Sequence, residues 1–340
     1  MTKPPGGIAT PARLGEHRGM DDVPRHGRGP QKHPEMAAYQ ALSEAAFARY
    51  PDTTTLPLPI AREIQEEVGR SFARGGPEMA ETVERLPQVH GRYMLCRCHY
   101  PVTDRPLPVL VYLHGGGWMW NSIYTHDRLI RSYAAASGLA VVAPDYSLSP
   151  DSRFPTAVEE CVAFVHWLVR RGAEWGLDPG RMVIGGDSAG ANLTVATALR
   201  LRDAGGPMPR GLLLNYGVYD SDLTRPSYRA YATGHMLTAA KMKLFWDAYA
   251  PTPEAKADPI AAPLRADLRG LPPALMHVAE LDVLHDENIL MAERLKAAGV
   301  ATELTVYPGM LHGFLRALGH VRAADQAVAA AGAWLKDRVA

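Results

Sequence analysis

Residues 182–190 read MVIGGDSAG, and this stretch decides the fold class. MVIG has the apolar, β-branched character of a buried strand, and the residues that follow, 188–203, have the composition of a helix. Ser188 therefore stands at a turn between a strand and a helix, flanked by Gly186 and Gly190. A serine in a G-x-S-x-G turn of this kind is typical of a nucleophile elbow, although an ordinary strand-to-helix turn is the alternative.

Strand-like and helix-like stretches alternate on both sides of this turn. Because the strands are strongly apolar, the alternation predicts an α/β fold with a mainly parallel sheet and helices on both faces. Thr156 and Glu159 have the spacing of a capping box at the start of one helix. We expect strands at 109–113, 139–144, 182–186, 211–216, 274–280 and 303–308, and helices at 156–171, 188–203, 284–298 and 321–338.

Three parts of the chain lie outside this alternation. Residues 1–33 are rich in Gly, Pro and Arg, which predicts a mobile tail; a basic interaction arm is the alternative. Residues 34–90 are helix-like, and residues 217–262 form a long connection without a core strand. We expect both to build a helical cap on a catalytic domain that spans residues 91–340.

Size, charge and cysteine content narrow the class of protein. The chain has 340 residues, of which 47% are hydrophobic, enough for a large core. Lys+Arg and Asp+Glu each number 36, so nothing indicates a nucleic-acid partner. No apolar run could span a membrane and no secretion signal opens the chain, so we expect a cytoplasmic protein. The three cysteines, Cys96, Cys98 and Cys161, argue against a disulfide framework, and the first two should share one face of a strand.

The motif HGGGW (114–118) directly follows the strand candidate at 109–113. Glycines at the end of a strand let the backbone approach a substrate closely. Together with the N–H group of Ala189, those of Gly115 and Gly116 could stabilise the oxyanion of a tetrahedral intermediate. A flexible turn and a phosphate cradle are the alternatives, but the motif lacks the spacing of a phosphate-binding fingerprint.

A serine nucleophile needs a base, and the base needs a carboxylate that orients it. His312 follows the last strand candidate, and Asp282 follows the strand candidate at 274–280. Both therefore belong to loops at the carboxyl ends of strands, which line the active crevice of such sheets. The chain order Ser188, Asp282, His312 is the one this fold uses. No metal-binding spacing is evident, so we expect neither a catalytic metal nor a cofactor.

Other histidines and carboxylates are weaker candidates. Asp145 also follows a strand and is the second choice for the acid, but it precedes the nucleophile. His285 and Asp286 fall where a helix should begin, and His277 should lie inside a strand. His126 and His235 could border the pocket, but neither follows a strand.

These motifs together resemble the hormone-sensitive-lipase-like branch of the α/β-hydrolases, the bacterial esterases called family IV. The resemblance spans residues 107–318 and implies a capped α/β-hydrolase fold with the triad and oxyanion hole at the residues named above. Members of this family often form dimers, so a homodimer is expected. The motifs that carry the resemblance are HGGGW (114–118), THDRL (125–129), DYSLSP (145–150), FPTAVEEC (154–161), GGDSAGANL (185–193), LPPALMHVAELDVLHDE (271–287) and YPGMLHGF (307–314).

The chain departs from the family pattern at two places that bear on the shape of the pocket. DYSLSPD (145–151) stands where the family usually reads D-Y-R-L-A-P-E, and Ala191 replaces a usual glycine. Trp118 and Trp120 place two large rings near the oxyanion loop. We expect them to border the pocket, with Asp187, and to favour short acyl groups; packing against the cap is the alternative.

The sequence therefore predicts a serine carboxylesterase that forms an acyl-enzyme on short-chain or small-molecule esters. An acyltransferase or lyase on the same scaffold stays open, because an acyl-enzyme can also react with an alcohol or an amine. A non-catalytic receptor for a small molecule is the alternative from another class. We expect no partner beyond the small ester and a second copy of the chain, neither nucleic acid nor membrane.

Overall fold

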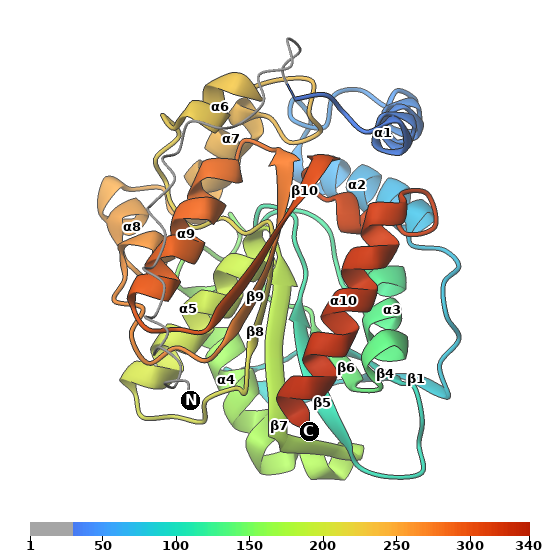
Figure 1. Ribbon diagram of the computed structural model, residues 1–340, viewed down its shortest axis with the longest axis vertical. Helices are drawn as coiled ribbons and strands as arrows, with labels where there is room; N and C mark the ends of the chain where they lie inside the picture. The colour runs from blue at the N-terminus through green and yellow to red at the C-terminus, as the bar shows by residue number, and fades with distance from the viewer. Residues whose placement is uncertain (1–29) are drawn as a thin grey trace, which may run out of the picture. The chain divides into compact units, whose positions relative to one another are not determined.

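A central sheet of eight strands organises the protein in a computed structural model that describes residues 30–340 (Figure 1). Pairing is parallel from β6 through β10, whereas β1 and β4 join antiparallel at one side. This confirms the predicted α/β fold with a mainly parallel sheet. Across the sheet the strands are β1 (Glu81–Arg85), β4 (Cys96–Tyr100), β6 (Ala140–Pro144), β5 (Leu107–Leu113), β7 (Leu177–Asp187), β8 (Leu212–Asn215), β9 (Ala274–Leu281) and β10 (Thr302–Leu311).

Two hydrophobic cores lie on the two faces of the sheet. Side chains of β5 alternate between them: Val109 and Val111 belong to one core, and Leu110 and Tyr112 belong to the other. This alternation is the pleat of a strand whose faces are both covered. One face carries α3 (Asp127–Ser137) and α10 (Arg322–Val339), and the other carries α4 (Thr156–Arg171), α5 (Ala189–Asp203) and α9 (His285–Ala297) (Figure 1).

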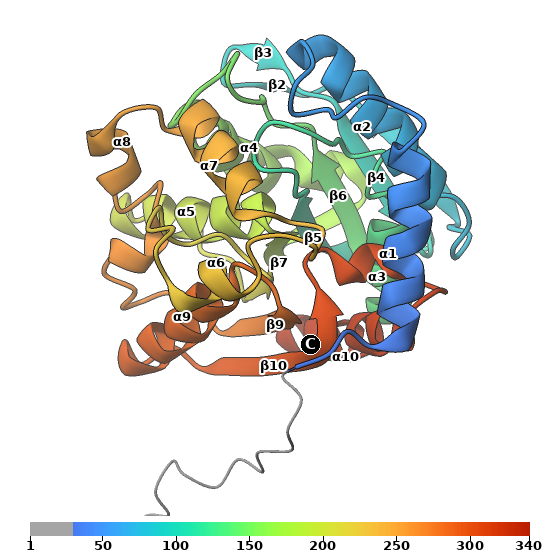
Figure 2. The same ribbon diagram turned by 90° about the horizontal axis from the view of Figure 1, so that it is seen from above.

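Further helices lie above the carboxyl ends of the parallel strands, as Figure 2 shows from above. They come from the two segments expected to form the cap. The first gives α1 (Pro34–Phe47) and α2 (Leu58–Phe72), and the second gives α6 (Pro226–Ala230) and α7 (Ala239–Tyr249). The second segment also contains α8 (Pro253–Ala257), which lies lower, at the level of α9, in the view of Figure 1. The division into cap and catalytic domain stays a prediction. All these elements belong to the unit Lys32–Ala340, and almost all of the predicted tail, residues 1–33, lies outside the described residues.

Two details differ from the expectations. The sheet begins at β1, before the predicted domain start at residue 91, because Glu81–Arg85 pairs with β4 as an edge strand. Its exposed, polar sequence gives no strand signal of its own. The expected capping box is wrong: Pro155 holds the N-cap position of α4, so Thr156 already lies inside the helix. Shorter elements are β2 (Gln88–Val89), β3 (Arg92–Tyr93), η1 (Gly172–Trp175), η2 (Pro263–Arg265) and η3 (Phe314–Ala317).

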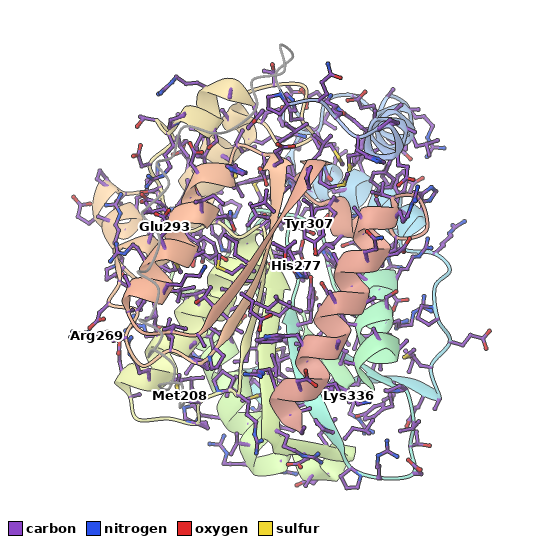
Figure 3. All side chains as sticks on the ribbon, viewed as in Figure 1. Met208, Arg269, His277, Glu293, Tyr307 and Lys336 are labelled. Carbon is purple, nitrogen blue, oxygen red and sulfur yellow. The ribbon has the colours of Figure 1, made fainter. Side chains whose placement is uncertain are left out.

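His277 lies within β9 and is fully enclosed, as expected. Its Nδ1 is 3.1 Å from Asn215 Oδ1, and its ring meets Tyr307 of the neighbouring strand edge to face (Figure 3). Burial lowers the pKa of His277 to about 4, so the ring is neutral near pH 7. His277 is therefore a part of the core and not a base for Ser188.

The cysteines are buried and unpaired. Cys96 and Cys98 lie on one side of β4, as predicted, and burial raises the pKa of the Cys98 thiol to about 12. Within residues 30–340, no group of three or more His, Cys, Asp or Glu side chains is arranged to hold a metal ion. In the same part of the chain, none of the helices is long and apolar enough to cross a membrane.

Candidate active site

Ser188 forms the turn between the end of β7 and the start of α5. Its backbone angles, φ 55° and ψ −118°, are rare for any residue other than glycine. A Cβ on Gly190 would overlap the carbonyl of Leu113, and one on Gly186 would lie 2.5 Å from that carbonyl oxygen. The turn therefore needs both glycines, because it passes directly over the end of β5. The Ser188 N–H group donates to the carbonyl of Asn215 at 2.9 Å, which fixes the turn on β8 as well.

The three residues predicted as a triad lie in one hydrogen-bonded series. His312 Nε2 is 3.0 Å from Ser188 Oγ, and His312 Nδ1 is 2.7 Å from Asp282 Oδ2. A carboxylate can only accept, so Nδ1 carries the proton and donates to Asp282. In the neutral ring, Nε2 is then free to accept from the Ser188 hydroxyl. This is the arrangement in which an imidazole can take a proton from a serine.

Exposure differs along this series. Asp282 is 1% exposed, Ser188 7%, and the His312 side chain 13%. The other oxygen of Asp282 accepts from the N–H group of Leu284 at 3.0 Å, which fixes the carboxylate. The carboxylate is thus sealed from water, while the serine and histidine remain within reach of a molecule in the cavity.

The alternative candidates lie elsewhere. Asp145 is not bonded to His312, and burial raises its pKa to about 6. Asp286 accepts from the N–H group of Ser227, and His285 lies in the first turn of α9. His235 and His126 do not line the cavity; the Nε2 of His126 instead lies 3.3 Å from Asp187 Oδ2.

The loop after β5 presents different N–H groups from those expected. The N–H group of Gly115 donates to Asp187 Oδ1 at 3.1 Å, so it is not available to a substrate. This corrects the expected role of Gly115. Gly116 and Gly117 line the cavity beside Ser188, and neither N–H group has a partner within residues 30–340. Ala189 is the first residue of α5, and the first N–H groups of a helix have no partner inside it.

Close contacts hold this loop in place. A Cβ on Gly116 would overlap the carbonyl of Trp120, and one on Gly117 would overlap the ring of Phe245. Both glycines also have positive φ, 131° and 62°. Asn121 Nδ2 donates to the carbonyl of Gly115 at 3.2 Å. The loop therefore keeps one shape, which is a requirement for N–H groups that stabilise a transition state.

Asp187 fixes the loop after β5 through its hydrogen bond with Gly115. Its Oδ1 accepts from the Tyr112 hydroxyl at 3.0 Å as well as from Gly115. Burial raises the pKa of Asp187, but His126, the charge of Arg316 and the Tyr112 hydroxyl lower it more, so the pKa lies below its usual value. Asp187 also lines the cavity, as a buried and hydrogen-bonded carboxylate.

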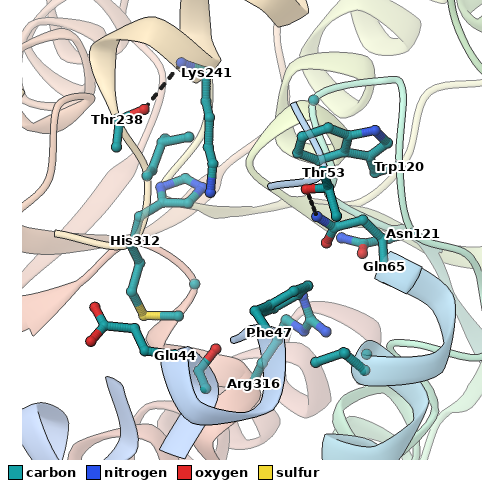
Figure 4. A pocket seen from close by; sticks show the side chains of 18 of the residues that line it. Glu44, Phe47, Thr53, Gln65, Trp120, Asn121, Thr238, Lys241, His312 and Arg316 are labelled. Carbon is teal, nitrogen blue, oxygen red and sulfur yellow. Dashed lines mark hydrogen bonds between the residues drawn. The ribbon is translucent and has the colours of Figure 1, made fainter. Parts of the chain in front are cut away.

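A cavity of about 510 Å³ opens on Ser188 and His312 (Figure 4). Its walls come from α1, α2 and α7 as well as from the loops after the strands. Trp120 lines it and meets Phe245 edge to face, with ring centroids 5.0 Å apart. Trp118 does not line it: this ring stacks on Tyr249 of α7 at 4.1 Å. Of the two predicted pocket rings, only Trp120 borders the cavity, and Trp118 packs against the segment expected to form the cap.

Three residues of the site were not foreseen. Gly117, unlike Gly115, has an N–H group without a partner in the described chain, which the spacing of HGGGW does not reveal. Arg316 lies in η3, four residues after His312 in the sequence, and that short separation was a usable signal. Lys241 lies on α7, within the long connection 217–262, and the sequence alone does not show that it enters the cavity while Lys243 does not.

Comparisons with known proteins find that this chain is similar to esterases. A sequence profile of the family described as alpha/beta hydrolase fold matches residues 110–316. An ethyl acetate hydrolase of Pseudomonas putida is 33% identical over 308 residues, which cover 86% of this chain and 95% of that enzyme. A carboxylesterase of Mycobacterium tuberculosis, NlhH, is 38% identical over 240 residues, which cover 69% of this chain and 75% of that enzyme.

Solved structures agree with these relatives. A thermostable esterase from Pseudomonas putida has a TM-score of 0.86 and 35% identity, and the match covers 92% of this chain and 99% of that one. A hyperthermophilic esterase from Pyrobaculum calidifontis has a TM-score of 0.83 and 32% identity, with 90% and 98% coverage. The likeness therefore extends beyond the catalytic strands to most of the described chain.

Proposed function

Since the chain belongs to the α/β-hydrolase family, we propose that it cleaves carboxylic esters through an acyl-enzyme formed on Ser188. The chain is a carboxylesterase, as the hormone-sensitive-lipase-like motifs predicted. The observation that carries the proposed mechanism is the hydrogen-bonded series from Ser188 through His312 to Asp282. A serine, a correctly protonated imidazole and a buried carboxylate in that order are what acyl transfer requires.

In the first half of the reaction, Ser188 Oγ attacks the ester carbonyl while His312 Nε2 takes the hydroxyl proton. Asp282 holds the imidazolium that forms. The N–H groups of Gly116, Gly117 and Ala189 stabilise the oxyanion. The alcohol leaves with the proton from His312, and the acyl group stays on Ser188.

In the second half, a water molecule gives a proton to His312 and attacks the acyl carbonyl. The tetrahedral intermediate uses the same N–H groups, and its collapse returns the proton to Ser188 and releases the acid. The cycle consumes one ester and one water and restores the enzyme.

Labelling with diethyl p-nitrophenyl phosphate tests this assignment. The reagent should phosphorylate Ser188 and release about one equivalent of p-nitrophenol, because the activated serine attacks phosphorus as it attacks a carbonyl. Peptide mass spectrometry should find the added diethylphosphoryl group on the peptide that contains Ser188. His312→Gln should label far more slowly. Stoichiometric label on another residue, or ester hydrolysis by a protein that resists the reagent, would contradict the mechanism.

We propose that Trp120 limits the length of the acyl group. Trp120→Ala should shift the best p-nitrophenyl ester toward longer chains, because it removes an indole that lines the cavity. Trp118→Ala is the matched control: this ring is fully buried outside the cavity, so its loss should leave the chain-length profile unchanged. It should instead lower the free energy of unfolding by about 3–5 kcal/mol. A profile that moves equally in both variants would remove the special role of Trp120.

A further inference from the structure

Two cationic side chains, Lys241 and Arg316, line the same cavity as Ser188 and His312. Neither has a carboxylate within 4 Å among residues 30–340, whereas other lysines and arginines of that part of the chain form ion pairs. Lys243, on the same helix as Lys241, is an example: its Nζ lies 2.6 Å from Asp247. The cavity therefore contains positive charge that the described protein does not neutralise by direct contact.

The carboxylates of the cavity are already engaged. Asp52 accepts from the N–H group and the hydroxyl of Thr54, and Glu44 accepts from Gln40. Asp187 is held by its own set of donors. Asp52 acts on Lys241 only through space, beyond ion-pair distance. None of these groups therefore supplies a close partner for Lys241.

Lys241 is placed to meet a bound molecule. Figure 4 shows its side chain extending from α7 into the cavity, on the side where the His312 ring lies. Burial lowers the pKa of Lys241 even though Asp52 opposes that shift. A half-buried ammonium without a partner is costly, and a negative group in the cavity would remove the cost.

Arg316 adds positive potential from another wall. It lies in η3, across the cavity from Lys241 in the view of Figure 4. Its guanidinium packs against α2, where a Cβ on Gly69 would lie 3.2 Å from Nη2. This contact keeps the guanidinium beside the cavity, where its charge also helps to lower the pKa of Asp187.

Resting on the proposed ester hydrolysis, we propose that the preferred substrates are esters that carry a carboxylate, with Lys241 as its direct ion-pair partner and Arg316 as a second source of positive potential. The charge is either on the acid part or on the alcohol part of the ester. Charge-assisted hydrogen bonds to a carboxylate are about twice as strong as neutral ones, so they can decide between substrates of equal size.

Two matched substrate pairs test this preference. Monoethyl adipate and ethyl adipamate differ by a carboxylate in the acid part, and 2-acetoxypropanoate and its amide differ by one in the alcohol part. Acid release, followed by titration at constant pH, gives kcat/KM for each. The wild type should favour the charged member of at least one pair by about tenfold or more. Equal or lower values for the charged member of both pairs would overturn the proposal while leaving ester hydrolysis intact.

Variants then assign the preference to its residues. Lys241→Met should abolish the ratio of charged to neutral kcat/KM, and Arg316→Gln should reduce it. Lys243→Met is the matched control on α7, with its ammonium exposed and paired outside the cavity, and it should keep the wild-type ratio. A preference that survives Lys241→Met would overturn the role of this lysine.

A binding measurement keeps the test independent of turnover. Ser188→Ala protein should bind adipate by calorimetry at least about tenfold more tightly than adipamide, and adding Lys241→Met should remove that difference. Adipamide bound as tightly as adipate would contradict the inference even if no ester were turned over. Failure of hydrolysis together with selective adipate binding would count against the proposed reaction alone.

Discussion

Replacing Ser188 by alanine should lower kcat for p-nitrophenyl acetate by at least about 10⁴-fold. The substitution removes the only atom in the hydrogen-bonded series that can form the acyl-enzyme, while His312 and Asp282 stay in place. The residual turnover should come from direct attack of water on the bound ester. The backbone N–H groups proposed to stabilise the oxyanion remain in the variant and still assist that attack. Initial rates on wild type and variant, measured side by side over a series from acetate to palmitate, check the prediction.

Controls separate chemistry from folding in this comparison. Serine and alanine both carry a Cβ, so the strain of the positive φ at position 188 is the same in wild type and variant. The melting temperature should therefore change little. Ser132→Ala, on the outer helix α3, removes a hydroxyl that donates to the carbonyl of Arg128, outside the cavity, and should leave kcat unaltered. Turnover by Ser188→Ala within tenfold of wild type would show that another residue is the nucleophile.

The positions of the three residues proposed as a triad could be predicted because each follows a strand. Strand ends are visible as the point where an apolar run stops, and parallel strands bring those ends to one edge of the sheet. Asp282 after β9 and His312 after β10 therefore could be placed from the sequence, and the structure brings them together with Ser188. The position of Ser188 depends in addition on a close contact between the elbow and the end of β5, which leaves no room for a side chain at Gly186 or Gly190.

The oxyanion loop was less predictable because its hydrogen bonds depend on a distant part of the chain. Gly115 and Gly117 look equivalent in HGGGW, yet Asp187 from the end of β7 takes the N–H group of Gly115. The surroundings of the two tryptophans in this region could not be predicted for the same reason. Trp118 and Trp120 are two residues apart in a turn, and α7 decides which ring is covered and which borders the cavity.

The edge of the sheet shows a different limit. β1 is short, polar and half exposed, so its place comes from pairing with β4 and not from its own composition. Hydrophobic periodicity detects strands that are buried, and an edge strand gives it little signal. Lys241 and Lys243 also could not be told apart from the sequence. They have the same side chain, but Lys241 lines the cavity and Lys243 pairs with Asp247 outside it.

Asp282→Asn should lower kcat by about 10⁴-fold, close to the loss of the nucleophile itself. The change is one atom in size, so packing around this buried side chain is kept. Its effect is on the position of the His312 ring proton. The amide can turn its NH₂ group toward His312 Nδ1, which then accepts a hydrogen bond. The ring proton therefore moves to Nε2, and Nε2 can no longer accept the proton of the Ser188 hydroxyl. The imidazolium also loses its counter-charge during the reaction. Measured kcat on p-nitrophenyl acetate, with an unchanged melting curve, gives the size of this effect.

Asp145→Asn is the contrast that decides which carboxylate orients the base. Asp145 also follows a strand of the sheet, but its side chain has no contact with His312, and its backbone carbonyl, which accepts from Arg92 at 2.8 Å, is unaffected by the change. This variant should therefore hydrolyse p-nitrophenyl acetate at close to the wild-type rate. If the two variants lost activity equally, or if Asp145→Asn lost more, the hydrogen bond between His312 and Asp282 would not be the one that catalysis uses. A large loss confined to Asp282→Asn would mean that the tautomer of a single imidazole, set by a fully buried carboxylate, controls the reactivity of Ser188.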